Sequence, residues 1–145
     1  MTDKNTRLLQ ILGGDIHALN FCRDIAFVSE IFDDIYDGDE PPKSQIEDAL
    51  TCVLNLPANP FYRANFDYLH PVIDLAITHW IASNQVNKDN IERAHFFRYL
   101  GVQIWVSAAT IKHGAKEAAK LIYEIWDFST METLEEFKHE IIKPI

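Results

Sequence analysis

Residues 15–38 read DIHALNFCRDIAFVSEIFDDIYDG and carry the longest regular pattern in the first half of the chain. Apolar residues recur there at spacings of three and four, which is typical of a helix with one buried side. Asp15 is a favourable N-cap, and Gly38 is a favourable residue just past a helix end. The stretch therefore predicts one long amphipathic helix. Its apolar positions are Phe21, Ile25, Phe27, Val28, Ile31, Phe32 and Ile35.

Glycines, prolines and capping residues also divide the rest of the chain into helices. Strand-like alternation of apolar and polar residues is absent from the sequence. Gly13-Gly14 ends a short first helix, and Pro41-Pro42 breaks the chain after the long one. The patterns Ser44-x-x-Glu47 and Ser129-x-x-Glu132 resemble capping boxes that open two further helices. Further helices are expected from Asn59-Pro60 to Trp80, with a kink or a split at Pro71, and over 115–126.

The stretch from Asn90 to about His113 is apolar on almost every side. Such a helix belongs in the middle of a bundle. The sequence therefore predicts an all-α fold, a single domain over residues 1–145. We expect a bundle of six to eight helices around a long apolar central helix.

Composition narrows the choice of partner. The 145 residues carry a formal net charge of -9, so the surface repels nucleic acid and anionic membranes and favours a basic protein. Signal-peptide and membrane-length apolar runs are lacking, and Cys22 and Cys52 fall in apolar patterns that favour buried free thiols. We therefore expect a cytoplasmic protein. The many aromatic residues fill one core or leave a face for a homodimer.

A carboxylate stripe runs along the end of the first long helix. Glu30, Asp33, Asp34 and Asp37 lie at i, i+3, i+4 and i+7, which places all four on one side of a helix. Carboxylates are the ligands that Mg²⁺ and Mn²⁺ prefer, and a metal held this way can clamp a phosphate. The stripe is therefore a candidate metal site.

The same stripe also fits an ordinary solvated face, because it lies roughly opposite the apolar side of its helix. Repulsion between like charges at i+4 spacing argues against a solvated face without a neighbouring cation, since each pair destabilises a helix by roughly 0.2–0.5 kcal/mol. Between Arg23 and Lys43 the sequence has no Lys or Arg. We therefore expect a cation from elsewhere, either a metal ion or basic side chains.

Two enzyme families contain similar acidic patterns. Glu30-x-x-Asp33-Asp34-x-x-Asp37 resembles the Asp-Asp-x-x-Asp element of isoprenoid synthases and the acidic helices of all-α nucleotide pyrophosphohydrolases. These resemblances imply a metal-dependent enzyme acting on a phosphate or diphosphate. In such an enzyme we expect Arg63 or Arg98 to meet the phosphate, and Arg63 follows the predicted helix start at Asn59-Pro60, where anions are favoured. The chain departs from both families, because the second acidic motif that each requires is missing.

Polar residues form a narrow stripe on the predicted central helix. They are Glu92, His95, Tyr99, Gln103 and Thr110. The stripe fits a buried hydrogen-bond network or the wall of a pocket that faces the carboxylates. Glu92-x-x-His95 and Glu136-x-x-His139 also match the Glu-x-x-His pairs of ferritin-like di-iron bundles, although the C-terminal helices are too short and polar for that fold.

Three segments together resemble small helical proteins encoded by tailed bacteriophages and prophages. They are residues 32–41, 56–62 and 69–71, in that order and spacing. The resemblance implies expression in the cytoplasm of a bacterial host, and it assigns no catalytic residues. Two hypotheses follow. One is a phage accessory protein, without catalysis, whose acidic face binds a host or phage protein; the other is the Mg²⁺- or Mn²⁺-dependent phosphate-handling enzyme.

Overall fold

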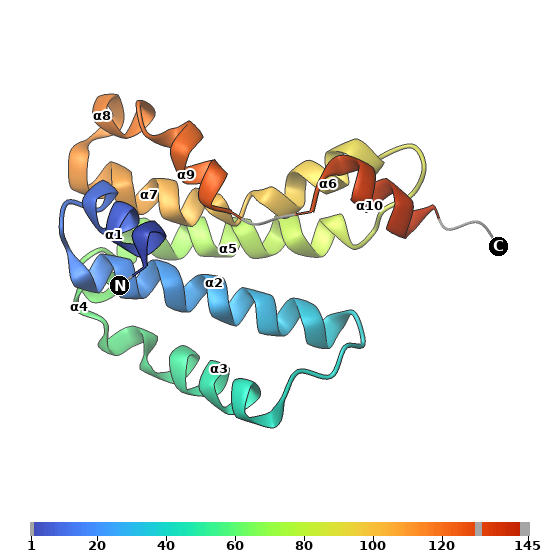
Figure 1. The fold of residues 1–145 in the computed structure, drawn as a ribbon, viewed down its shortest axis with the longest axis horizontal. Coiled ribbons are helices and arrows are strands. Elements are labelled where there is room, and N and C mark those ends of the chain that lie inside the picture. The colour runs from blue at the N-terminus through green and yellow to red at the C-terminus, as the bar shows by residue number, and fades with distance from the viewer. Residues whose placement is uncertain (1, 130–131, 143–145) are drawn as a thin grey trace. The chain divides into compact units, whose positions relative to one another are not determined.

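The computed structural model describes residues 2–129 and 132–142. Within these residues the chain forms ten α-helices and one short 3₁₀ helix, and no strand, which confirms the all-α fold class (Figure 1). Contacts group the chain into two compact units, Met1–Phe66 and Asp67–Ile145. The single domain over residues 1–145 stays a prediction.

The first unit is built around the helix that the opening pattern predicts. Within it α2 packs against α1, α3 and α4, and α2 and α3 form a hairpin in which the two helices lie side by side (Figure 1). The elements are α1 (Asp3–Ile11), α2 (Ile16–Tyr36), α3 (Lys43–Asn55), the 3₁₀ helix η1 (Leu56–Ala58) and α4 (Pro60–Ala64).

Both ends of α2 are fixed by the residues that the sequence indicates. The Asp15 side chain accepts hydrogen bonds from the backbone N–H groups of His17 and Ala18, at 2.9 and 3.2 Å. Gly38 has φ +85°, and the N–H of Asp39 donates to the carbonyl of Asp34 at 2.9 Å. This is the Schellman arrangement, in which a glycine takes the left-handed conformation that other residues avoid. The chain therefore leaves α2 directly into Asp39 and Glu40.

Aromatic rings hold the start of α2 against α4. Phe21 is fully buried, and its ring lies 5.8 Å from Phe61 and 5.2 Å from Tyr62 between centroids. The Asn59 side chain caps α4 and also donates a 3.0 Å hydrogen bond to the backbone carbonyl of His17. The predicted cap and proline at Asn59-Pro60 are therefore confirmed.

The second unit holds the remaining helices. Within it α7 packs against α8 and α9, and α10 packs against α6. The elements are α5 (Phe66–Ser83), α6 (Ile91–Tyr99), α7 (Val102–His113), α8 (Ala115–Ala119), α9 (Ile122–Phe128) and α10 (Leu134–Ile141). None of the helices in the described part of the chain is long and apolar enough to span a membrane.

The predicted long central helix is wrong, because the chain breaks at Leu100-Gly101 into α6 and α7. There Leu100 donates to Phe97 and Gln103 donates to Leu100, so bonds of three-residue span replace those of the α-helix. Glycine destabilises a helix interior by roughly 1 kcal/mol relative to alanine, so Gly101 makes a break at this point less costly.

Other breaks also raise the number of helices above the predicted six to eight. The stretch from Asn59 splits at Asn65, and α5 then continues through Pro71, where we expected the break. Residues 115–126 divide at Lys120 and Leu121 into α8 and α9. These breaks lack a glycine or proline, so punctuation alone could not place them.

The capping box predicted for Ser44 and Glu47 does not form. The cap of α3 is Pro42, without a side-chain hydrogen bond. The box proposed for 129–132 includes residues 130 and 131, which lie outside the described residues. The C-terminal helix begins later, where the Thr133 hydroxyl accepts a 3.1 Å hydrogen bond from the N–H of Glu136. Thr133 and Glu136 have the same spacing as the proposed box, one turn further on.

Candidate functional site

The structure places the carboxylate stripe at the exposed end of the α2–α3 hairpin. Glu30, Asp33 and Asp34 lie in the last two turns of α2, and Asp37 is its C-cap. Glu30 and Asp37 are exposed, and Asp33 and Asp34 are half-buried. The regular helix through residue 36 therefore brings the four positions to one side, as their spacing predicts.

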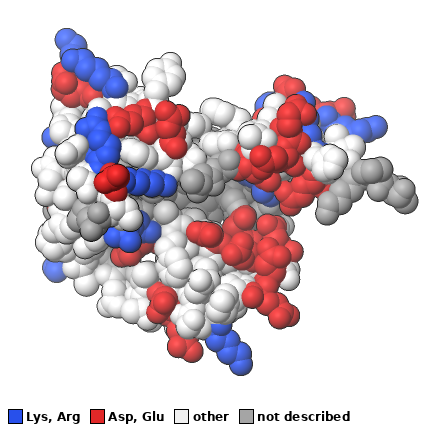
Figure 2. Space-filling model, in the orientation of Figure 1, with Lys and Arg blue, Asp and Glu red and all other residues white. Residues whose placement is uncertain are grey.

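The charged residues that surround the stripe in the sequence are all acidic. Residues 24–42 contain seven acidic residues and no Lys or Arg. Figure 2 shows acidic side chains gathered over the end of α2 and the loop that follows it. The C-terminal end of a helix carries a partial negative charge, so these carboxylates also oppose the helix dipole. The arrangement therefore favours a cationic partner at this end of the hairpin.

The metal interpretation depends on which other ligands the described residues bring near the stripe. Among the residues that the structure describes, no group of three or more His, Cys, Asp or Glu side chains is arranged to hold a metal ion. A single helical row supplies carboxylates from one direction only, so waters or a phosphate would complete the octahedral shell that Mg²⁺ requires. A site for Mg²⁺ or Mn²⁺ at Glu30, Asp33, Asp34 and Asp37 stays a prediction.

The two arginines proposed for phosphate lie in different units. Arg63 is exposed in the last turn of α4, at the opposite end from the helix start that suggested anion binding. Arg98 lies in the last turn of α6, where its guanidinium already has partners. It is 3.2 Å from the Asn84 side-chain oxygen, 3.5 Å from a Glu132 carboxylate oxygen and 4.9 Å from the centre of the Phe137 ring. Phosphate binding by either residue stays a prediction.

The polar stripe of the predicted central helix divides at the break. On α6, the Tyr99 hydroxyl donates a 2.8 Å hydrogen bond to the Glu132 carbonyl, and the His95 Nε2 lies 2.9 Å from the same oxygen. Glu92 lies 3.5 Å from the Nζ of Lys138 on α10. These residues thus form a network that holds α10 and the residues before it. On α7, Gln103 is exposed and Thr110 bonds its own helix.

The sequence analysis gave Glu132 no role in this network. Burial raises the pKa of its carboxyl to about 7, and a hydrogen bond with Glu140 and the charges of Glu140 and Glu136 act in the same direction. Arg98 opposes them by lowering the pKa. Burial, with the charges of Glu132 and Glu136, also raises the pKa of Tyr99. The capping-box pattern assigned Glu132 to the start of a helix, and therefore did not indicate a half-buried carboxyl with a raised pKa.

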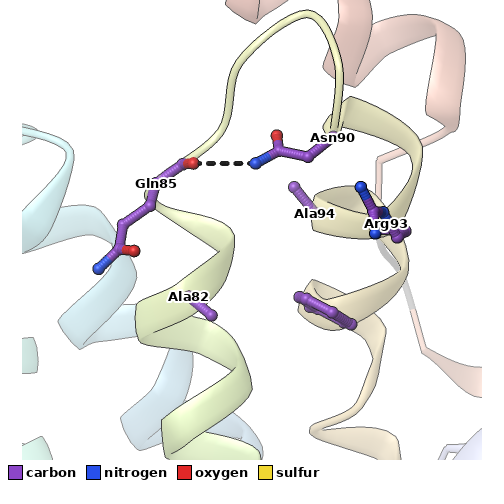
Figure 3. Close-up of a pocket in the computed structure, with 6 residues that line it drawn as sticks. Ala82, Gln85, Asn90, Arg93 and Ala94 are labelled. Carbon is purple, nitrogen blue, oxygen red and sulfur yellow. Dashed lines mark hydrogen bonds between the residues drawn. The ribbon is translucent and has the colours of Figure 1, made fainter.

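A hollow of about 270 Å³ lies between the end of α5 and the start of α6 (Figure 3). The Asn90 side chain closes one side of it by donating a 3.2 Å hydrogen bond to the backbone carbonyl of Gln85. Its lining contains one cation and no carboxylate, so it is not a metal site of the expected kind. The lining residues are Ala82, Gln85, Asn90, Arg93, Ala94 and Phe97.

Beside the acidic stripe, α2 exposes large apolar side chains that the sequence pattern assigned in part to the core. Phe32, Ile35 and Tyr36 are 55%, 45% and 60% exposed, whereas Ile31 is buried. At about 100° per residue, Phe32 and Tyr36 lie well away from Ile31, and this offset is the signal that could have separated them from the core.

Comparison of the chain with protein-family models, curated proteins and solved structures found no match. The resemblances to phage proteins and to the two enzyme families stay predictions.

Proposed function

We propose that this protein acts without catalysis, by binding a basic protein at the acidic end of the α2–α3 hairpin. The observation that supports this most is the charge of residues 24–42, seven acidic residues without a Lys or Arg, at the exposed end of a helix whose dipole adds to their potential. Such a surface attracts and orients a cationic partner over a range set by the ionic strength.

Repulsion within the stripe supports the same proposal. Glu30 and Asp34 are one helical turn apart, so their charges destabilise α2 by a few tenths of a kcal/mol. A partner that brings Lys or Arg relieves this repulsion when it binds, and its affinity gains by the same amount. The proposal includes the phage-accessory interpretation, in which the partner is a bacterial or phage protein in the host cytoplasm.

The test compares three forms of the full chain, immobilised and exposed to bacterial lysate. They are the parent, a stripe variant (Glu30→Gln, Asp33→Asn, Asp34→Asn, Asp37→Asn) and a matched control that removes four exposed carboxylates elsewhere (Asp89→Asn, Glu117→Gln, Asp127→Asn, Glu135→Gln). We expect a basic protein to be retained by the parent and the control, to be lost from the stripe variant, and to elute as salt is raised. Equal retention by all three forms would refute the proposal.

A further inference from the structure

The exposed apolar residues at the end of α2 form a defined patch. Phe32, Ile35 and Tyr36 are spaced i, i+3 and i+4, so they share one side of the last turns. We call these three residues the apolar patch. Water contacts about half of each side chain, and aromatic residues in this setting are enriched at protein interfaces.

The carboxylate row of Glu30, Asp33 and Asp37 lies further around α2, and Asp33 is its member nearest this patch. Asp33 follows Phe32 and Asp37 follows Tyr36 in the chain, so each acid lies about 100° around the helix from an aromatic residue. Asp33 is also three residues before Tyr36, which makes the two side chains neighbours on the helix surface. Asp33 and Tyr36 thus lie next to each other where the acidic and the apolar sides of these two turns meet.

Resting on the function proposed above, we propose that the partner binds here through a basic amphipathic helix. Its apolar side covers Phe32, Ile35 and Tyr36, and its Lys or Arg residues reach Asp33 and Asp37 of the carboxylate row. The patch from Phe32 to Tyr36 extends about 6 Å along α2, which is about one helical turn. A helix that offers apolar residues at i, i+3 and i+4 matches that length.

Charge argues against a second copy of this chain as the occupant. A symmetric dimer places the same surface on both sides of the interface. The carboxylate row of one copy would then lie close to that of the other, and like charges across an interface cost several kcal/mol. A basic segment meets the same row with opposite charge and still covers the apolar patch.

The test uses two synthetic peptides of identical composition, made of leucine and lysine. In one, the leucines follow the helical period and form a single stripe; in the other, their order is scrambled so that no stripe forms. Binding of each labelled peptide to the full chain is followed by fluorescence anisotropy at fixed ionic strength. We expect the striped peptide to bind about tenfold more tightly, because only it can cover the patch.

Three variants then separate the contributions. Phe32→Ser/Tyr36→Ser should weaken the striped peptide about tenfold and leave the scrambled one unchanged. Asp33→Asn/Asp37→Asn should weaken both peptides. The matched control Tyr123→Ser removes an 86% exposed aromatic residue of the second unit and should change neither. Circular dichroism checks that each variant is folded, and the single substitution Tyr36→Ser replaces the double one if it unfolds.

The outcomes distinguish this inference from the function on which it rests. If the apolar variants bind both peptides like the parent while the charge variant weakens both, the amphipathic helix is wrong and the acidic binding surface stands. If the charge variant binds both peptides like the parent, the proposed function fails and the inference fails with it.

Discussion

The Tyr99 hydroxyl donates a 2.8 Å hydrogen bond to the backbone carbonyl of Glu132, a residue 33 positions further along the chain. The His95 Nε2 lies 2.9 Å from the same oxygen, and the His95 ring lies 5.4 Å from the ring of Phe137. Phe137 is fully buried and packs with Ile91 and Ala94 of α6. Polar contacts before α10 and apolar contacts within it therefore attach the same C-terminal segment to α6.

Removal of the Tyr99 hydroxyl should weaken this attachment. In Tyr99→Phe the ring can keep its stacking on Trp126, at 5.6 Å between centroids, so the change isolates the hydrogen bond. We expect the free energy of unfolding to fall by about 1 kcal/mol, measured by urea denaturation. Tyr123→Phe, at an 86% exposed position, is the control and should unfold like the parent. Equal stabilities of Tyr99→Phe and the parent would contradict the role given to this bond.

The raised pKa of Glu132 predicts a pH dependence of stability. The folded state keeps the proton up to a pKa of about 7, whereas the unfolded state releases it near the ordinary value of 4.5. Between these values the folded state binds more protons, so raising the pH lowers the free energy of unfolding, by on the order of 1 kcal/mol. The loss is complete above pH 7.

Glu132→Gln should remove this contribution, because glutamine does not titrate. The difference in unfolding free energy between variant and parent should shift in favour of the variant as the pH rises from 4 to 8, in urea denaturation at several pH values. Glu135→Gln, at an exposed position of α10, should keep the pH profile of the parent. A difference between Glu132→Gln and the parent that stays constant with pH would show that Glu132 titrates normally.

The two glycines at the ends of α7 should respond to substitution in opposite ways. Gly101 has φ -58° and ψ -29°, and an added Cβ would meet no atom within 4 Å. Gly101→Ala should therefore stabilise the fold by about 0.4–1 kcal/mol, by reducing the freedom of the unfolded chain. Gly114 has φ +81°, so Gly114→Ala should be destabilising by about 1 kcal/mol or more. Thermal melting of both variants checks the sign, and a Gly101→Ala protein that melts below the parent would contradict it.

The sequence predicted elements well where a local signal acts alone. Asp15 and Gly38 determine the two ends of α2 through their own side chain and backbone conformation, so both ends were predictable. The break at Leu100 was not, because a single glycine between apolar residues is compatible with a continuous helix. Glu132 shows the same limit, since its environment depends on residues 33 and 34 positions earlier in the chain. Spacing placed the four carboxylates on one side of α2, but it could not show that Phe32 and Tyr36 beside them are exposed.

Divalent metal ions provide the sharpest choice between the two functions that the acidic stripe predicts. If the stripe serves a basic partner, the parent should melt at the same temperature in EDTA, Mg²⁺, Mn²⁺ and Ca²⁺. Glu30→Gln/Asp34→Asn should then melt at the same temperature or slightly higher, since it removes a like-charge pair one turn apart and two charges that oppose the helix dipole.

A metal held in the native state must instead raise stability, by about 2.7 kcal/mol at a hundredfold excess over Kd. The melting temperature would then rise with Mg²⁺ or Mn²⁺ in the parent and in the matched control Glu117→Gln/Asp127→Asn, but not in Glu30→Gln/Asp34→Asn. That result would establish the metal site and favour the phosphate-handling enzyme over the binding protein. Because the control removes the same number of carboxylates from the second unit, it separates binding at the stripe from a general attraction of cations to a chain of net charge -9.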